Sequence, residues 1–332
     1  MAACSSAAAA VGATLRPVLW SHIPYHVPYT LGLALQERLV ARRFEARAQL
    51  AELPAPSPAS RVAAAVAPAS SSTSAQALQR ISETDTLLLL EHTPVYTEGR
   101  RKGAREAVGD DAERQRLEKL GADYLVTQRG GQITYHGPGQ LVGYPIWDLA
   151  AMQLSTRCYV DKLQTAIAEL LHARPFNLET VPPPDDHTGV WADSDHKITS
   201  IGIQVRHRIT SHGFALNVEA ERLLPWFRQI VACGIEGKGM TTLERELALA
   251  AQRAGLVQPD AADGVQLEPG LVLLPRQRIT VADIAPAVAH QLGATYGRAV
   301  EPAPEAELRY EGNADGVLTH VWLADEEVLA PQ

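Results

Sequence analysis

The sequence is poor in aromatic residues and lacks blocks of like charge. Aromatics make up 5% of its 332 residues, and the net charge is −8. No run of Lys or Arg is long enough to form a basic surface, which disfavours nucleic-acid binding. No apolar run approaches the roughly 18 residues that cross a bilayer, so no membrane segment is predicted.

Cysteine is scarce as well, with only Cys4, Cys158 and Cys233. Three cysteines do not make a disulfide framework in a chain this long, so we expect a reducing compartment. No histidine stands at metal-ligand spacing from them, and no metal site is predicted. GxGxxG and GxxxxGK[ST] are absent too, which removes the ordinary reasons for a phosphate cradle and leaves no predicted cofactor.

The amino-terminal segment is rich in Ala and Ser and contains Arg16, and no acidic residue precedes Glu37. This composition favours an organelle transit segment, so residues 1–19 are expected to be a transit or disordered segment. A disordered cytosolic tail is the alternative, since chain termini are permissive. The chain is thus expected in the mitochondrion or, failing that, in the cytoplasm.

A Pro/Ala/Ser tract occupies residues 53–78, with almost nothing to bury. We expect a mobile insertion there. It separates a helix predicted over residues 29–47 from the apolar run of residues 86–90, which is typical of a buried strand. The tract is therefore predicted to interrupt one domain rather than to separate two.

The remaining chain mixes strand and helix patterns without strict alternation. We expect strands around the Gly-rich turns of residues 126–149, helices over 160–172, beyond 244 and over 281–296, a hairpin from 197–205 and 211–218, loops at 182–186 and 260–269, and an acidic, irregular tail with an edge strand at 317–323. This predicts an α/β fold with a mixed (α+β) sheet. A catalytic domain over 20–300 and a C-terminal extension over 301–332 are expected.

Cys233 and Lys197 are the candidates for covalent chemistry. Cys233 lies in Val-Ala-Cys-Gly-Ile, where small neighbours leave a thiol accessible; a small buried hydrophobe is the alternative. Lys197 shares strand parity with Ile201 and Ile203, which points its amine inward unless the strand starts one residue later. An ammonium beside a thiol lowers the thiol's pKa and raises its thiolate fraction.

Residues 129–140, RGGQITYHGPGQ, crowd four glycines around one arginine and one histidine. Bare backbone lets another chain or a ligand approach the main chain closely. A phosphate cradle, a flexible surface loop and a slot for a flat-lying ligand are the interpretations that this segment leaves open by itself.

Several motifs in order resemble the lipoyl(octanoyl) transferases of lipoate biosynthesis. They are LLLLEHTPVYTEGR, RGGQITYHGPGQLVGYPIWDL, TGVW, KITSIGIQVRHRITSHGFALNV, CGI and TTLERE, and the resemblance runs from about Tyr29 to Glu246. The resemblance implies a catalytic domain like those of lipoate and biotin protein ligases. It implies an acyltransferase that moves an octanoyl group from acyl carrier protein to a lysine of a lipoyl domain. Ala232 and Thr93 depart from prolines common in the family, which concerns loop stiffness more than chemistry.

The family's functional residues carry over onto matching positions. Cys233 corresponds to the cysteine that holds the acyl group as a thioester, and Lys197 to its partner. The substrate-contacting segments correspond to Arg129, Gly130, Gly131, Gln132, Ile133, Thr134, Tyr135 and His136, to Ser200, Ile201 and Gly202, and to Gly213, Phe214 and Ala215. The implied partners are acyl carrier protein and lipoyl-domain proteins (the glycine cleavage H protein and the E2 subunits of 2-oxoacid dehydrogenases), and a monomer is expected.

Two other functions are weighed against this one. An ATP-dependent lipoate or octanoate ligase on the same fold would need nucleotide-phosphate recognition, for which the sequence offers no additional signature. A non-catalytic lipoyl-domain binder would not need Cys233. The basic clusters Arg100–Lys102 and Arg206–Arg208 are interpreted as solvated turns or as docking points for an acidic partner.

Overall fold

The computed structural model describes residues 14–53, 74–100, 110–184, 187–232, 237–256, 265–268, 271–273, 278–324 and 326–330. Most of the Pro/Ala/Ser tract (residues 54–73) lies outside the described residues, as do Cys4 and Cys233. Residues 74–78 begin a helix, so the prediction is wrong for them, whereas the mobility of residues 54–73 stays a prediction.

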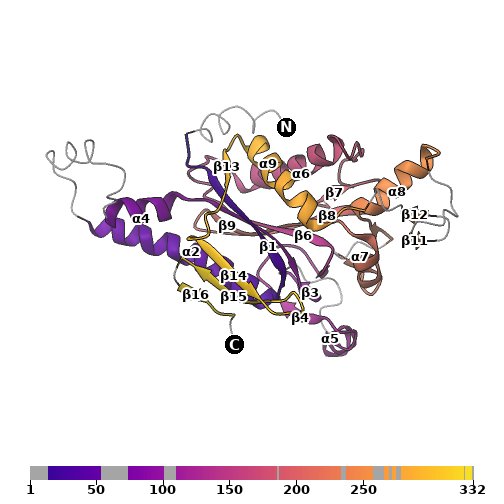
Figure 1. The fold of residues 1–332 in the computed structure, drawn as a ribbon, viewed down its shortest axis with the longest axis horizontal. Coiled ribbons are helices and arrows are strands. Elements are labelled where there is room, and N and C mark those ends of the chain that lie inside the picture. Colours follow the sequence, from indigo (N-terminus) through magenta and orange to yellow (C-terminus); the bar gives the residue numbers. More distant parts are fainter. Residues whose placement is uncertain are drawn as a thin grey trace.

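A mixed sheet forms the centre of the fold, in the order β10-β8-β9-β6-β2-β1-β13 with β7 paired to β8 (Figure 1). Its strands are β1 (Val18–Val27), β2 (Thr86–His92), β6 (Gln140–Ile146), β7 (Val190–Trp191), β8 (His196–Arg206), β9 (Ile209–Asn217), β10 (Gly239–Met240) and β13 (Val300–Pro302). β1 is parallel to β2 and β13, whereas β2, β6, β9 and β8 form an antiparallel series. The predicted mixed α/β sheet is confirmed.

Helices cover both faces of this sheet. α6 (Thr156–His172) and α9 (Val281–Tyr296) pack on one face, where their apolar residues join those of β2, β6 and β9 in the larger core. α2 (Tyr29–Glu52) packs on the other face over a second core. Each predicted helix is present, and α9 has the predicted bounds because a Thr280–Asp283 capping box opens it and Gly297, at φ 67°, ends it.

A smaller sheet in the order β4-β3-β5 lies beside the first. It consists of β3 (Val95–Glu98), β4 (Asp123–Val126) and β5 (Thr134–His136), and its core is shared with α5 (Asp110–Glu118) and α7 (Ala220–Phe227). α8 (Leu243–Arg253) contacts a two-stranded sheet of β11 (Val265–Glu268) and β12 (Leu271–Leu273). β11 lies within the loop predicted over 260–269, so that loop prediction is wrong for these four residues.

The C-terminal tail is ordered, contrary to the prediction of an irregular segment. β14 (Leu308–Gly312), β15 (Leu318–Leu323) and β16 (Glu326–Val328) form an antiparallel sheet with β15 in its centre, not at an edge. Leu308, Val321 and Val328 are buried in the core beneath α2. This burial stabilises the strands and could not be read from the acidic local sequence. α4 (Ser74–Glu83) was also missed, and the boundaries expected near 19 and 301 fall inside β1 and β13.

The predicted hairpin of β8 and β9 is confirmed, and its turn is two residues long. His207 and Arg208 occupy it at φ 48° and 67°, and Arg206 pairs with Ile209. Two positive φ angles give a type I′-like turn whose twist matches that of the flanking strands. The basic cluster Arg206–Arg208 is therefore an exposed turn.

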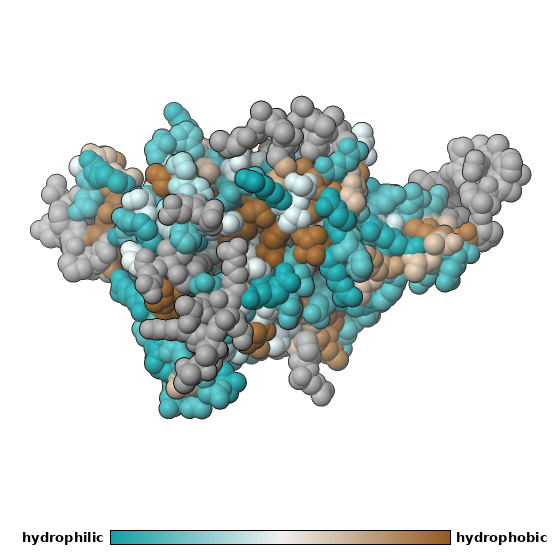
Figure 2. Space-filling model, turned by 180° about the vertical axis from the view of Figure 1, so that it is seen from behind, coloured by the Kyte–Doolittle hydropathy of each residue, from teal (hydrophilic) through white to brown (hydrophobic). Residues whose placement is uncertain are grey.

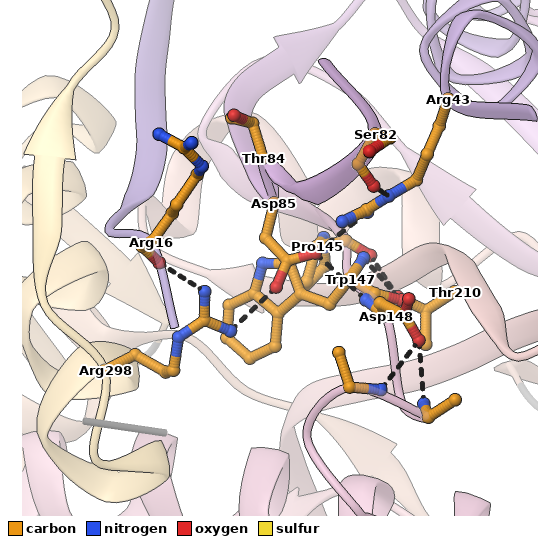
Figure 3. Close-up of polar contacts among 12 residues, drawn as sticks. Arg16, Arg43, Ser82, Thr84, Asp85, Pro145, Trp147, Asp148, Thr210 and Arg298 are labelled. Atoms are coloured by element: carbon orange, nitrogen blue, oxygen red, sulfur yellow. Dashed lines mark hydrogen bonds and ion pairs between the residues drawn. The ribbon is translucent and has the colours of Figure 1, made fainter. Parts of the chain in front are cut away.

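A buried ionic cluster joins elements that are far apart in the sequence (Figure 3). Asp85 precedes β2 and lies 2.8 Å from Arg43 Nη1 of α2 and 2.7 Å from Arg298 Nη1 after α9. Its Oδ1 also accepts a hydrogen bond from the main-chain N–H of Asp148. One carboxylate thus joins α2, the end of β6 and the end of α9.

The surface is largely hydrophilic on the face opposite that of Figure 1, with apolar residues showing near its middle (Figure 2). Among the described helices, none combines the length and apolarity that a membrane span requires.

Candidate active site

A pocket with a cavity volume of about 50 Å³ lies where β5, β6, β8, β9 and α2 meet. Twelve of the predicted substrate-contacting residues line it, namely Arg129, Gly130, Gly131, Gln132, Thr134, His136, Ser200, Ile201, Gly202, Gly213, Phe214 and Ala215. Three segments that are distant in the sequence therefore meet around one space.

Tyr29, Val142, Tyr144 and His212 complete the lining, and sequence reasoning missed them. Tyr29 opens α2, and its signal was only its place at the start of a predicted helix. Val142 and Tyr144 alternate along β6, in a motif already quoted for the resemblance. The period of two along β6 could have found this pair.

Ile133 and Tyr135 are not among the lining residues. The alternation along β5 turns Tyr135 into the core of the smaller sheet, where it stacks on Trp226 at a centroid distance of 5.2 Å. Gly137 is needed there, because a Cβ at that position would lie 2.1 Å from Tyr135 Oη. We therefore retain the other twelve residues as candidates.

Bare backbone allows the loop of residues 129–131 to lie directly against β8. The Gly130 N–H donates to Ile203 O at 3.1 Å, and a Cβ on Gly202 would come within 2.9 Å of Gly130 O. Gly131 adopts φ 88°, which L-residues rarely do. A slot for a flat-lying ligand stays our prediction for this segment, which lines the cavity.

Arg129 places a buried positive charge in the cavity wall. Its guanidinium donates to Thr97 O at 2.6 Å, to Thr97 Oγ1 at 2.7 Å and to Gly130 O at 3.0 Å, and the residue is 6% exposed. Thr97 belongs to the EHTPVYTEGR motif, so that motif fixes the orientation of Arg129. A fixed cation of this kind can orient a polar group of a ligand.

Three histidines at or beside the cavity are held neutral. Burial lowers the pKa of His92 to about 4 and, together with the charge of Arg129, that of His212 to about 4. Burial lowers the pKa of His136 well below its ordinary value, and the neighbouring His92 and Arg129 add to the effect. His92 donates from Nδ1 to Val27 O at 2.7 Å and accepts at Nε2 from Tyr144 Oη at 2.6 Å. A neutral ring satisfies both contacts, since a carbonyl can only accept.

These depressed pKa values predict a loss of stability in mild acid. Above pH 6.5 the rings are neutral in both states; below it the unfolded chain binds protons that the folded chain does not, so the free energy of unfolding falls as the pH drops towards 4. A pKa that falls from 6.5 to about 4 on folding lowers the free energy of unfolding at pH 4 by roughly 3 kcal/mol per group, relative to neutral pH. Urea denaturation between pH 7.5 and pH 4.5 would measure the slope.

A His212→Asn variant removes the contribution of one histidine to the pH dependence of stability, while the contribution of the carboxylates, which also titrate in this range, stays. Asn tolerates the φ of 54° found at this position, and the variant should show a shallower dependence on pH. His172→Asn, at an exposed position, should leave the slope unchanged. A His212→Asn slope equal to that of the unaltered protein would contradict the prediction.

Lys197 points inward, as its strand parity predicted. The residue is 3% exposed, and its Nζ donates to Thr188 O at 3.0 Å and lies 4.9 Å from the centroid of the Trp191 ring. Thr188 and Trp191 belong to the TGVW motif, whose Gly189 has no room for a Cβ beside Thr199 O, at 2.5 Å. The TGVW motif thus forms a cradle for the lysine, a role that sequence reasoning missed.

Cys233 lies outside the described residues, but the chain on both sides of it is placed. Ala232 packs against the core of the smaller sheet, and after Gly237 the chain enters β10, where Met240 pairs with Lys197. Cys158, in the first turn of α6, is disulfide-bonded, unlike the reduced cysteines expected of a reducing compartment.

The family model for the lipoyl protein ligase A/B catalytic domain matches residues 67–258. An octanoyl-[acyl-carrier-protein]:protein N-octanoyltransferase (LIPT2, mitochondrial) of Danio rerio is 48% identical over 163 residues, which cover 49% of this chain and 68% of the relative. The chain belongs to the octanoyltransferase family. It is an acyltransferase of lipoate biosynthesis.

Two further relatives in sequence agree with this assignment. The human protein of the same name is 42% identical over 167 residues, which cover 50% of this chain and 68% of the human one. An Arabidopsis thaliana octanoyltransferase (LIP2, mitochondrial) is 40% identical over 162 residues, which cover 49% of this chain and 66% of the relative. A Thermoplasma acidophilum structure described as a putative lipoate protein ligase with bound lipoic acid covers 87% of this chain and 89% of its own at 13% identity, with a TM-score of 0.49.

Among the described residues of this octanoyltransferase, no group of three or more His, Cys, Asp or Glu side chains is placed to hold a metal ion. The TTLERE motif is structural. Thr242 caps α8 by accepting from the Arg245 N–H, and Glu244 accepts from the Ala220 N–H at 2.9 Å.

Proposed function

We propose that this octanoyltransferase takes its octanoyl group from acyl carrier protein and delivers it to a lysine of a lipoyl domain through a thioester on Cys233. The cavity is the single observation that carries this proposal. Its wall combines glycine backbone, the apolar side chains of Val142, Ile201 and Phe214, and one buried cation. Burial of each methylene is worth about 0.8 kcal/mol, so the apolar part of this wall favours the methylenes of an octanoyl chain.

In the first step the Cys233 thiolate attacks the carbonyl carbon of the carrier thioester. The carbon–sulfur bond to the pantetheine arm breaks, and the departing sulfur takes a proton from the Lys197 ammonium. One thioester replaces another, so the step is nearly balanced in energy and needs no ATP. The pairing of Met240 with Lys197 is compatible with the proposal, because Cys233 lies seven residues earlier, a chain reach of at most about 24 Å.

In the second step the neutral ε-amine of the acceptor lysine attacks the acyl-enzyme. An amide bond forms, the bond to Cys233 breaks, and the amine proton passes to neutral Lys197, which restores the starting state. We prefer Lys197 to His136 as this base. Burial and neighbouring charges hold the pKa of His136 well below its usual range, which makes the ring a poor proton acceptor.

We also propose a mitochondrial location, with the glycine cleavage H protein and the E2 subunits of 2-oxoacid dehydrogenases as acceptors. The support is the mitochondrial designation of several relatives. Arg206, the exposed last residue of β8, leaves open a docking point for an acidic partner. Arg208 instead donates to Leu154 O and is held against the fold.

Intact-mass spectrometry after exposure to octanoyl carrier protein should show one octanoyl adduct, and peptide mapping should place it on Cys233. Adding a lipoyl domain should move the group to the acceptor lysine. Octanoate with ATP, in place of the carrier, should give neither product. Product formation from octanoate and ATP alone, or normal turnover by Cys233→Ser, would overturn the mechanism.

A further inference from the structure

A chain of buried amides runs from the cavity to the strand beside Lys197. His136 Nδ1 lies 2.7 Å from Gln140 Oε1, Gln140 Nε2 donates to Asn217 Oδ1 at 2.9 Å, and Asn217 Nδ2 donates to Thr241 O at 2.9 Å. The Thr241 N–H in turn donates to Lys197 O at 2.9 Å. Gln140, Asn217 and Thr241 are at most 1% exposed.

The direction of every hydrogen bond in this chain is fixed by main-chain carbonyls. Thr241 O can only accept, so the Asn217 amide must turn its NH₂ towards it and its oxygen towards Gln140. Gln140 must then present its NH₂ to Asn217. The same NH₂ donates to Tyr135 O at 3.2 Å, a second carbonyl that independently requires this orientation.

His136 is left with one compatible tautomer. Because Gln140 turns its oxygen to the ring, Nδ1 must carry the hydrogen, and in a neutral imidazole Nε2 then carries a lone pair. The titratable or charged groups that face the ring are His92, His212 and Arg129, with Tyr29 stacked on it at 6.0 Å. The charge of Arg129 disfavours a second proton on the ring.

We propose that Gln140, oriented by Asn217, is a positioning residue that holds His136 as a hydrogen-bond acceptor for an N–H of the attacking acceptor amine. This inference rests on the proposed function, which brings that amine to the cavity. An amine that donates one N–H to His136 keeps its lone pair for the thioester carbon. The ring itself exchanges no proton in this step, and Lys197 remains the base.

Two isosteric variants separate positioning from stability. Gln140→Glu replaces the amide with a carboxylate, which favours an imidazolium at His136 and turns Nε2 into a donor. Asn217→Asp also buries a carboxylate, but it still accepts from Gln140 Nε2 and leaves the amide orientation and the tautomer as they are. Any loss of stability that a buried carboxylate causes by itself should therefore appear in both variants.

The direct test is ¹⁵N NMR of histidine-labelled protein without substrate. At pH 7.5 we expect a protonated Nδ1 and an unprotonated Nε2 at His136 in the unaltered protein and in Asn217→Asp, and protonation of both nitrogens in Gln140→Glu. A protonated Nε2 in the unaltered protein would overturn the proposal. Because no substrate is present, this result does not depend on whether the octanoyl mechanism is correct.

The functional test separates the two half-reactions. In Gln140→Glu, transfer from the acyl-enzyme to a lipoyl domain should slow by roughly tenfold at neutral pH, which equals about 1.4 kcal/mol. The loss should shrink as the pH rises and the imidazolium deprotonates, whereas adduct formation from the carrier should be nearly unchanged. Equal slowing of both half-reactions, or a matching slowing in Asn217→Asp, would refute the positioning role. Absence of any adduct in the unaltered protein would instead refute the proposed function.

Discussion

A Lys197→Met variant should form the octanoyl adduct and pass it on roughly 10²–10⁴ times more slowly than the unaltered protein, the range expected when a positioned acid–base group is lost. Methionine is a flexible apolar side chain that fills the buried space beside Trp191 without the charge. Loss of the ammonium removes both the stabilisation of the Cys233 thiolate and the base of the second step. Single-turnover adduct formation, followed by mass spectrometry at several pH values, would measure the first effect.

Lys238→Met is the matched control. Lys238 lies five residues after Cys233, directly before β10. It forms an ion pair with Asp195 at 2.7 Å, but its side chain is 30% exposed. We expect less than a threefold change in rate in this variant, because loss of an exposed pair costs at most about 1 kcal/mol of stability and should leave the fold intact. If both variants lose activity equally, the loop geometry rather than the Lys197 amine sets the rate. If Lys197→Met reacts normally, the assignment of Lys197 is wrong.

An Asp85→Asn variant should lower the free energy of unfolding by about 3–5 kcal/mol. The change leaves the guanidinium groups of Arg43 and Arg298, at 4% and 0% side-chain exposure, buried without their shared counter-charge (Figure 3). Removing one partner of a buried ionic cluster costs far more than removing an exposed pair, because the remaining charges cannot reach water. Urea denaturation at pH 7.5 would measure the difference from the midpoint and the slope.

Glu83→Gln controls for loss of a carboxylate in the same region. Glu83 pairs with Arg16 at 3.0 Å, but both side chains are nearly half exposed, so the expected cost is at most about 1 kcal/mol. A cost for Asp85→Asn no larger than that of Glu83→Gln would show that the buried cluster adds nothing beyond a surface pair. The denaturant slope should be unchanged in both variants, since neither alters the area exposed on unfolding.

Local patterning determined the regular elements that later proved correct. The apolar run of Thr86–Leu90, the alternation of β8 and β9 and the period of α9 can each be read within a few residues of sequence. The tail was misjudged for the converse reason. β14 to β16 are short and belong to an acidic tail, and their apolar side chains gain burial only beneath α2, which is about 280 residues away in the chain.

The candidate site divides in the same way. The sequence by itself identified the candidate reactive residues, because a glycine-flanked cysteine, a lysine of inward strand parity and a glycine-rich segment are local signals. Only the tertiary structure decided which groups meet: it turned Tyr135 away from the cavity, brought Tyr144 and His212 into its wall, and set the TGVW motif around Lys197. It also brought Asn217 against Thr241 O and Gln140, which orients the amides beside His136.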